Sequence, residues 1–254
     1  MNLNGFKNYV MQEVKYIHDD IVHNFSAARE ILPLVFSIHK PVNILDVGCG
    51  TGTWLKVAQD LGINQIQGID GSYVDRRMLK ITEDNFFEHD LNTSFNLNKK
   101  FDLAICLEVA EHLYPAAAGD LVASLTQHSD VILFSAALPG QGGQRHINEQ
   151  WPSYWQKRFD EKGYEMQDFI RLQIWNNPKI ERWYRQNIFL VVNKNHPLAK
   201  GENKEALSLI HPELFEAVAH QHQEKIKQLR KTIEKLQKRD IIGSISKFLK
   251  PKKN

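Results

Sequence analysis

The chain has 254 residues, a length that accommodates one large α/β domain with an appendage or two small domains. Hydrophobic residues make up 42% and charged residues 24%, as in ordinary globular proteins, and the net charge of +2 indicates no polyanionic partner. Cys49 and Cys106 are too few for a disulfide framework or a CxxC metal site, and no apolar run suits a signal peptide or membrane span. We therefore expect a cytoplasmic protein.

The first part of the chain is predicted to be helical. Apolar residues recur at helical spacing from Tyr9 to Val22, and a second run follows from Ser26 to Ile38. These runs predict an N-terminal helical cap over residues 1–40.

Short apolar stretches then predict buried strands at Asn43–Val47, Gln65–Ile69, Phe86–Glu88, Phe101–Cys106 and Val131–Ser135. Helical segments lie between most of them, which predicts a doubly wound parallel sheet with helices on both faces. Two later candidates, Met166–Ile174 and Asn187–Val192, are expected to form an antiparallel pair at the edge. The expected fold is a Rossmann-like α/β sheet of about seven strands over residues 41–195, with the last strand antiparallel.

The composition changes after about Asn193. Residues 196–212 are predicted to be a linker, whereas apolar residues from Phe215 to Leu236 alternate spacings of four and three, as in a short coiled coil. Residues 213–254 contain eleven Lys or Arg and five Asp or Glu, a net charge of +6, so the rest of the chain carries −4. We expect a C-terminal helix that pairs in a homodimer or rests on the protein. Its basic amphipathic tail either contacts an anionic membrane surface or stays solvated.

The strongest motif follows the first predicted strand and reads Asp-x-Gly-x-Gly-x-Gly, from Asp46 to Gly52. Alternating glycines allow a sharp turn and a close approach to a ligand, and the following helix exposes unpaired N–H groups at its start. This pattern predicts a nucleotide site. The residues expected to contact the nucleotide here are Asp46, Gly48, Cys49, Gly50, Gly52, Thr53 and Trp54.

The spacing of the glycines narrows the choice of nucleotide. Dinucleotide sites carry GxGxxG, whereas here the third glycine comes one residue earlier and an acid ends the strand. Asp70, with Gly71 beside it, closes the second strand, where a carboxylate can accept hydrogen bonds from both ribose hydroxyls. The alternative for Asp70 is a helix N-cap.

Together with later blocks, this motif resembles the class I S-adenosylmethionine-dependent methyltransferases. The later blocks are Asp90-Leu91 after the third strand and Leu107-Glu108-x-x-Glu111-His112 after the fourth. The resemblance implies S-adenosyl-L-methionine as the cofactor, with Asp90 and Leu91 at its adenine and Leu107 and Glu108 beside it. Asp90 in a simple turn is the alternative.

A longer segment, Gly140-Gln-Gly-Gly…His146-x-Asn-Glu-Gln-Trp151, resembles a group of bacterial and phage methyltransferases. That resemblance covers roughly residues 16–193 and implies an enzyme of surface-polysaccharide or capsule biosynthesis that methylates a sugar-derived hydroxyl. The segment follows the fifth strand, at the edge where doubly wound sheets bind ligands. Residues expected to bind the substrate are His23, Gln141, Arg145, Asn148 and Gln150.

Histidine is suited to accept the proton of an alcohol because its pKa lies near working pH. His146 is the first candidate for this base, with Glu149 as its orienting partner, and His112 is the second. Glu108, Glu111, His112 and His146 could converge on a metal. The metal-free class explains the same Glu-x-x-Glu-His segment, so we expect no metal.

Other functions fit parts of the pattern. An NAD-dependent oxidoreductase shares the sheet and Asp70 but requires GxGxxG, and a non-catalytic interaction or membrane-docking protein would use the tail. Another small molecule or a phosphate-type compound is the alternative acceptor. Nucleic acid is disfavoured because the chain before residue 213 is net acidic.

Overall fold

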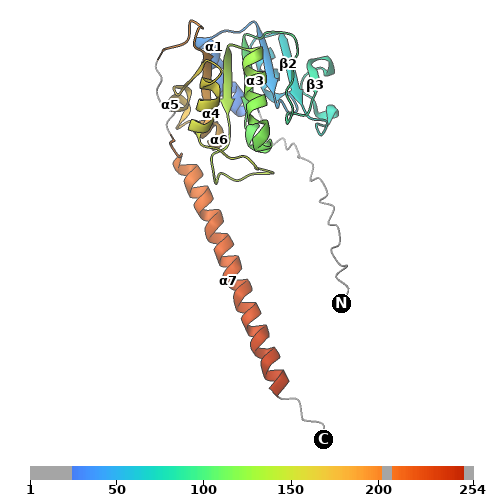
Figure 1. Ribbon diagram of the computed structural model, residues 1–254, viewed down its shortest axis with the longest axis vertical. Coiled ribbons are helices and arrows are strands. Elements are labelled where there is room, and N and C mark those ends of the chain that lie inside the picture. The colour runs from blue at the N-terminus through green and yellow to red at the C-terminus, as the bar shows by residue number, and fades with distance from the viewer. Residues whose placement is uncertain (1–24, 202–207, 249–254) are drawn as a thin grey trace. The chain divides into compact units, whose positions relative to one another are not determined.

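The computed structural model describes residues 25–201 and 208–248. A seven-stranded sheet with the order β3-β2-β1-β4-β5-β7-β6 forms the centre of the first unit (Figure 1). The strands are β1 (Asn43–Val47), β2 (Gln65–Asp70), β3 (Phe86–Glu88), β4 (Leu103–Leu107), β5 (Val131–Ser135), β6 (Tyr164–Gln167) and β7 (Phe189–Asn193). The first five are parallel, and β7 pairs antiparallel with both β5 and β6, which confirms the predicted Rossmann-like sheet.

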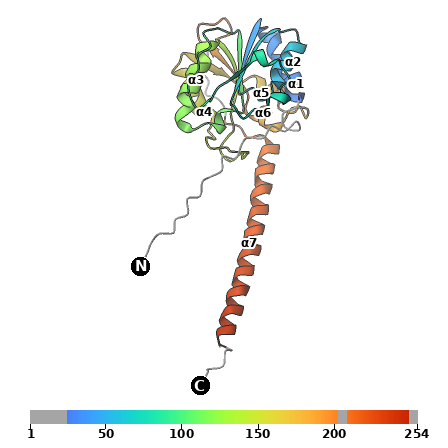
Figure 2. The same cartoon turned by 90° about the vertical axis from the view of Figure 1, so that its right-hand side faces the viewer.

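Helices cover both faces of this sheet. Figure 2 shows α3 (Ala118–His128) and α4 (Pro152–Asp160) on one face, with the remaining helices of the unit on the other. Those are α1 (Ser26–Ile38), α2 (Thr53–Asp60), α5 (Ile170–Ile174) and α6 (Arg182–Asn187). Successive strand residues point to opposite faces, so Leu133 packs in the α1 and α2 core, whereas Phe134 packs against Trp155 of α4. Both strand faces are therefore buried, as the continuous apolar runs predict.

Two sequence predictions differ from the structure or fall outside it. The strand predicted over Met166–Ile174 is wrong beyond Gln167, because residues 170–174 form helix α5. Ile170 and Ile174 are buried four residues apart, which is the spacing of one helix face, and Arg171 Nε donates to Asp168 at 2.7 Å across one turn. The helix predicted from Tyr9 to Val22 lies outside the described residues.

The second unit contains one continuous helix, α7 (Pro212–Phe248). The side chains of Ile226, Leu229, Ile233 and Leu236 are about half exposed along it. Among the described residues, no helix combines the length and apolar character needed to cross a membrane.

Candidate active site

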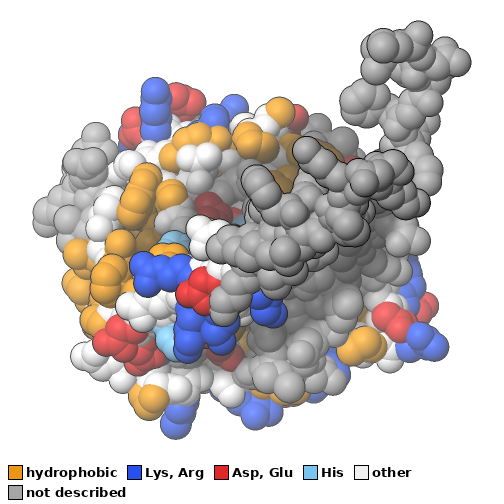
Figure 3. Space-filling view, turned by 90° about the horizontal axis from the view of Figure 1, so that it is seen from below, with side chains coloured by type: hydrophobic (Ala, Val, Ile, Leu, Met, Phe, Trp, Pro, Cys, Tyr) orange, Lys and Arg blue, Asp and Glu red, His pale blue; other side chains and the backbone are white. Residues whose placement is uncertain are grey.

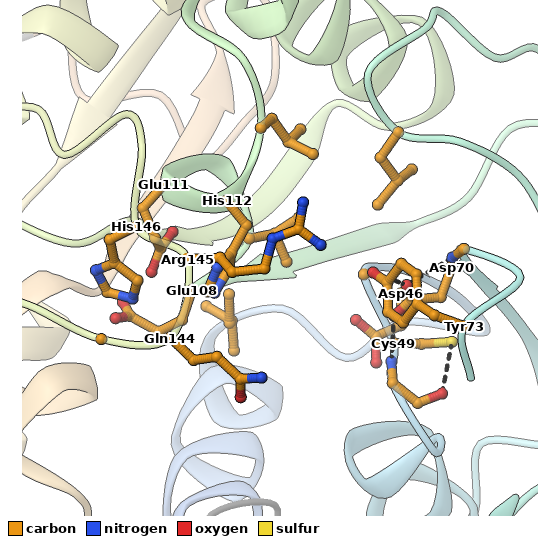
Figure 4. A pocket seen from close by; sticks show the side chains of 18 of the residues that line it. Asp46, Cys49, Asp70, Tyr73, Glu108, Glu111, His112, Gln144, Arg145 and His146 are labelled. Carbon is orange, nitrogen blue, oxygen red and sulfur yellow. Dashed lines mark hydrogen bonds between the residues drawn. The ribbon is translucent and has the colours of Figure 1, made fainter. Parts of the chain in front are cut away.

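The site is built where the carboxyl ends of neighbouring parallel strands meet. Strands β1 and β4 are adjacent although they are not consecutive in the chain, so the connections after them leave the sheet in opposite directions. A cavity of about 570 Å³ opens there, lined by the segments that follow β1 to β5 and by part of α6. The two groups of labelled side chains that line it are shown in Figure 4.

The loop after β1 is held in a conformation that requires glycine. Gly48, Gly50 and Gly52 have φ values of 78°, 53° and 84°. A Cβ atom on Gly48 would lie 2.2 Å from Cγ2 of Val109, the residue after Glu108. The loop then enters α2, whose first residues, Thr53 and Trp54, line the cavity. Because these positions are glycines, no side chain from the loop itself projects at them, and the loop and the start of α2 line the cavity.

Asp70 ties this loop to the end of β2. Its Oδ2 accepts from the Gly50 N–H at 2.7 Å, and its Oδ1 accepts from the Gly71 N–H at 2.6 Å and the Tyr73 hydroxyl at 2.5 Å. Asp70 is therefore held rigidly at the cavity. Tyr73 was not predicted as a site residue, because the sequence gives it no signal beyond its position three residues after Asp70.

Asp46 lies below the loop and is almost fully buried. Its Oδ2 accepts no hydrogen bond from the described residues. Burial, and then the negative charge of Asp70, raise the pKa of Asp46 well above its ordinary value. Burial likewise raises the pKa of the Cys49 thiol, so it is a packing group rather than a thiolate. A positive charge placed beside Asp46 would compensate for its burial.

Asp90, Leu91 and Leu107, which were expected beside the nucleotide, also line the cavity. Asp90 Oδ1 accepts from the backbone N–H and from the side-chain amide of Asn92, both at 3.0 Å. Asp90 thus forms the turn that was its alternative role and also lines the cavity.

Glu108 joins the two halves of the site. Its backbone is left-handed, with φ of 53°, and its N–H donates to the carbonyl of Ser135 at the end of β5 at 3.1 Å. Its carboxylate accepts from Gln141 Nε2 at 2.9 Å and from Asn187 Nδ2 at 3.1 Å. Gln141 and Glu108, predicted for substrate and cofactor respectively, therefore contact each other.

The loop after β5 docks onto the segment after β4. The backbone N–H groups of Ile147 and Asn148 donate to the carbonyl of Glu111 at 2.9 and 3.0 Å, and Asn148 Nδ2 donates to the carbonyl of Ala110 at 3.2 Å. This docking brings the ring of His146 to that of His112, with centroids 4.9 Å apart and the rings nearly perpendicular. The two candidate bases are therefore neighbours.

His146 has the partner that was predicted for it. Its Nδ1 lies 2.8 Å from Oε1 of Glu149, and the same carboxylate accepts from the N–H groups of Gly140 and Gly142, each at 2.7 Å. Glu149 thus fixes both the loop and the ring. Of the substrate candidates, Gln141 and Arg145 line the cavity.

The other substrate candidates lie elsewhere. Asn148 is buried, and its Oδ1 accepts from Gln150 Nε2 at 3.0 Å. Both residues therefore stabilise the loop and do not line the cavity. His23 lies outside the described residues. Trp183 and Tyr184 of α6 also line the cavity, although they were not among the site residues predicted from the sequence.

Two buried groups beside His146 have shifted pKa values. Burial, followed by the charges of His146 and Arg145, lowers the pKa of His112 to about 4, while hydrogen bonds to the carbonyls of Arg145 and Gln144 oppose the shift. Burial, and then the carboxylate of Glu108, raise the pKa of Glu111 well above its ordinary value. Ligand atoms of Glu111, His112 and His146 all lie within 4.8 Å of one another, an arrangement open to a metal ion.

A doubly wound sheet with an antiparallel β7, a glycine loop and an acid at the end of β2 defines the class of S-adenosylmethionine-dependent methyltransferases. The sequence model described as Methyltransferase domain matches residues 20–192. The chain therefore belongs to this family. This assignment replaces the oxidoreductase alternative.

Solved structures share the fold at low sequence identity. The sugar N-methyltransferase KedS8 from Streptoalloteichus sp ATCC 53650 is 16% identical with a TM-score of 0.54, covering 76% of this chain and 98% of its own. Streptomyces venezuelae DesVI is 15% identical with a TM-score of 0.50, covering 70% of this chain and 99% of its own. The amino pentose methyltransferase CalS10 from Micromonospora echinaspora is 14% identical with a TM-score of 0.50, covering 70% and 98%. No curated protein matches the sequence.

Proposed function

We propose that this methyltransferase transfers the methyl group of S-adenosylmethionine to a hydroxyl of a sugar or sugar phosphate, in the biosynthesis of a surface polysaccharide such as a capsule. The proposal includes membership of the bacterial and phage group marked by the segment from Gly140 to Trp151. The observation that carries it is the contact of His146 Nδ1 with Glu149 at 2.8 Å in a cavity that also holds the glycine loop.

The glycine-loop half of the cavity fits the cofactor. The start of α2 at the cavity suits the carboxylate of its amino-acid part, because the N–H groups of a first helical turn have no partner within the helix and favour an anion. The buried Oδ2 of Asp46 suits its ammonium group. Asp70 suits the ribose hydroxyls once the hydroxyl of Tyr73 yields its place on Oδ1. Asp90 and Leu91 are then left for the adenine.

The other half suits an acceptor that must lose a proton. The cofactor supplies a methyl group that its sulfonium charge has already activated. When the Nδ1–H of His146 donates to the Glu149 carboxylate, Nε2 of His146 is the nitrogen that can accept a proton. Nε2 then takes the proton of the acceptor hydroxyl while the hydroxyl oxygen bonds to the methyl carbon of the cofactor. The electron pair of the carbon–sulfur bond stays on sulfur. His112, whose pKa is lowered to about 4, stays neutral beside it.

Two observations support a sugar-like acceptor. The cavity wall near His146 carries the polar side chains Gln141, Gln144 and Arg145, which suit a polyhydroxylated compound. Two of the structures that share the fold are described as methyltransferases of a sugar and an amino pentose. On the described part of the face seen in Figure 3, basic side chains lie beside acidic ones, which favours a small acceptor over a polyanion. An amine or another small molecule is the alternative acceptor.

The experiment is to incubate the full chain with cofactor and a panel of sugar nucleotides, sugar phosphates, amino sugars and glycan extracts, and to search for a gain of one methyl group by mass spectrometry. We expect a hydroxyl-bearing product. His146→Ala should abolish turnover while the affinity for adenosylhomocysteine stays nearly unchanged, and His220→Ala, an exposed histidine of α7, should retain full activity. Methylation of amino sugars alone, or full activity of His146→Ala, would contradict the proposal.

We also propose that α7 pairs with a second copy of itself through its apolar seam, because Ile226, Leu229 and Ile233 are about half exposed at heptad spacing. Contact of the basic tail with a membrane surface stays a prediction.

A further inference from the structure

The loop after β5 and the short 3₁₀ segment Ala110–His112 after β4 place three metal-ligating side chains together. One ligand atom each from Glu111, His112 and His146 lies within 4.8 Å of the other two. Figure 4 shows Glu111, His112 and His146 grouped together, apart from the group around Asp46 and Asp70. One carboxylate and two imidazoles are a donor set typical of catalytic transition-metal sites.

The cluster is fixed by the fold. The carbonyl of Glu111 accepts from the N–H groups of Ile147 and Asn148, immediately after His146, at 2.9 and 3.0 Å. Asn148 is itself buried and bonded to the carbonyl of Ala110 at 3.2 Å. The 3₁₀ segment and the loop that carry the three ligands are thus joined by backbone hydrogen bonds, so the ligands are preorganised.

Glu111 provides a second observation. It is fully buried, and neither of its carboxylate oxygens meets the distance and angle criteria of a hydrogen bond among the described residues, although the carboxylate of Glu108 and the backbone of Ala137 interact with it. A buried carboxylate without such hydrogen bonds is costly unless a cation or a proton compensates for its charge. A cation between Glu111 and the two rings would provide that compensation.

We propose that Glu111, His112 and His146 bind one divalent first-row transition-metal ion, in preference to Mg²⁺. Imidazole nitrogens favour such ions, whereas Mg²⁺ favours oxygen ligands. Glu149, at 2.8 Å from His146 Nδ1, holds the ring so that Nε2 is the ligating atom, as carboxylates commonly do behind metal-bound histidines. The fourth candidate from the sequence, Glu108, is bound instead by the amides of Gln141 and Asn187.

The ion would change the role of His146, and this part rests on the proposed function. Three protein ligands leave coordination positions open toward the cavity, where an acceptor oxygen can bind. The positive charge would lower the pKa of that hydroxyl, whose proton leaves to water, so His146 would serve as a ligand and not as the base. This replaces the sequence-based expectation of a site without metal.

The test measures binding of Co²⁺ by the full-length protein after treatment with a chelator, without cofactor or acceptor. We expect one Co²⁺ per chain with visible absorption bands, displacement by Zn²⁺ and no displacement by Mg²⁺. Glu111→Gln and His146→Ala should each weaken binding more than 100-fold, and Glu149→Gln about 10-fold. His196→Ala is the matched control because His196 and His39 form a similar perpendicular histidine pair, 5.5 Å apart, elsewhere in the fold.

Thermal unfolding of each variant checks that it is folded. Absence of Co²⁺ binding, or equal binding by wild type, Glu111→Gln and His146→Ala, would overturn the metal site. Methyl transfer to a sugar that persists in chelator-treated protein but is lost in His146→Ala would overturn the catalytic role of the ion, while upholding the proposed function with His146 as base. Metal binding with the expected variant pattern but no methylated sugar in any panel would uphold the site and refute the acceptor.

Discussion

Replacing Gly48 by alanine tests the glycine loop and its proposed role in cofactor binding. Two separate effects are expected at this position. Its φ of 78° is unfavourable for any residue with a Cβ, and that Cβ would lie 2.2 Å from Cγ2 and 2.9 Å from Cγ1 of Val109. Gly62 provides a matched control: its φ is 95°, and a Cβ there would meet nothing within 4 Å.

The magnitudes follow from these contacts. The left-handed backbone costs an alanine about 1–2 kcal/mol at either position. Overlap with the buried Val109 adds about 1–3 kcal/mol at Gly48 alone, so Gly48→Ala should lower the free energy of unfolding by about 2–5 kcal/mol. In a chain of this size, each kcal/mol corresponds to a change in melting temperature of about 2–4 °C. In the double variant with Val109→Ala, most of the overlap disappears, so its loss should be smaller than the sum of the two single losses.

Urea unfolding of the four variants and wild type measures these terms, and the rise in melting temperature with adenosylhomocysteine reports binding. Gly62→Ala should keep the full ligand-induced rise, and Gly48→Ala should lose it. Equal destabilisation by Gly48→Ala and Gly62→Ala, or strict additivity with Val109→Ala, would refute the steric argument. A normal ligand-induced rise in Gly48→Ala would refute the role of the loop.

Three further outcomes are expected. Asp70→Asn should weaken adenosylhomocysteine about 10- to 100-fold in calorimetry, because it removes a charged acceptor worth about 1.5–3 kcal/mol; unchanged affinity would contradict this. The folded pKa of His112, about 4, lies below its ordinary 6.5, so the unfolded chain binds more protons between these pH values and stability falls as pH falls through that window. The loss in the free energy of unfolding is roughly 3 kcal/mol. Urea unfolding of chelator-treated protein should show this loss in wild type and not in His112→Gln. Leu229→Asp should convert a dimer to a monomer in light scattering, whereas the neighbouring Gln228→Asp, outside the seam, should not.

Most of the sheet could be predicted because buried parallel strands leave a simple signal. The short apolar runs between 43 and 135 are bounded by polar segments, and all five coincide with strands to within two residues at either end. The prediction failed at residues 168–174, where a run of mixed apolar residues fits a strand as well as a helix. The pair of Asp168 and Arg171 has helical spacing, but the packing of Ile170 against the core decides for the helix, and that contact is not visible in the sequence.

Some contacts of the candidate site could likewise be predicted from the sequence, and others could not. The contact of Glu149 with His146 could be predicted, because the two residues lie three apart in a loop after a parallel strand. Tyr73, Trp183 and Tyr184 could not, because an aromatic residue has the same pattern whether it packs in the core or faces a cavity. The sequence indicated that Glu111 and His146 could converge, but the backbone hydrogen bonds between the two loops that bring them together leave no signal in the sequence.

The position of the loop after β5 depends on the strained backbone of Glu108. Left-handed backbone at Glu108 costs about 1–2 kcal/mol, which the structure retains only because surrounding contacts enforce it. The N–H of Glu108 is held by Ser135, and its carboxylate by Gln141 and Asn187, from three different segments. An extended residue here would carry that carboxylate out of reach of both amides. Glu108 therefore couples the end of β4, the loop after β5 and α6 into one arrangement, so that the glycine-loop side and the histidine side of the cavity share a common support.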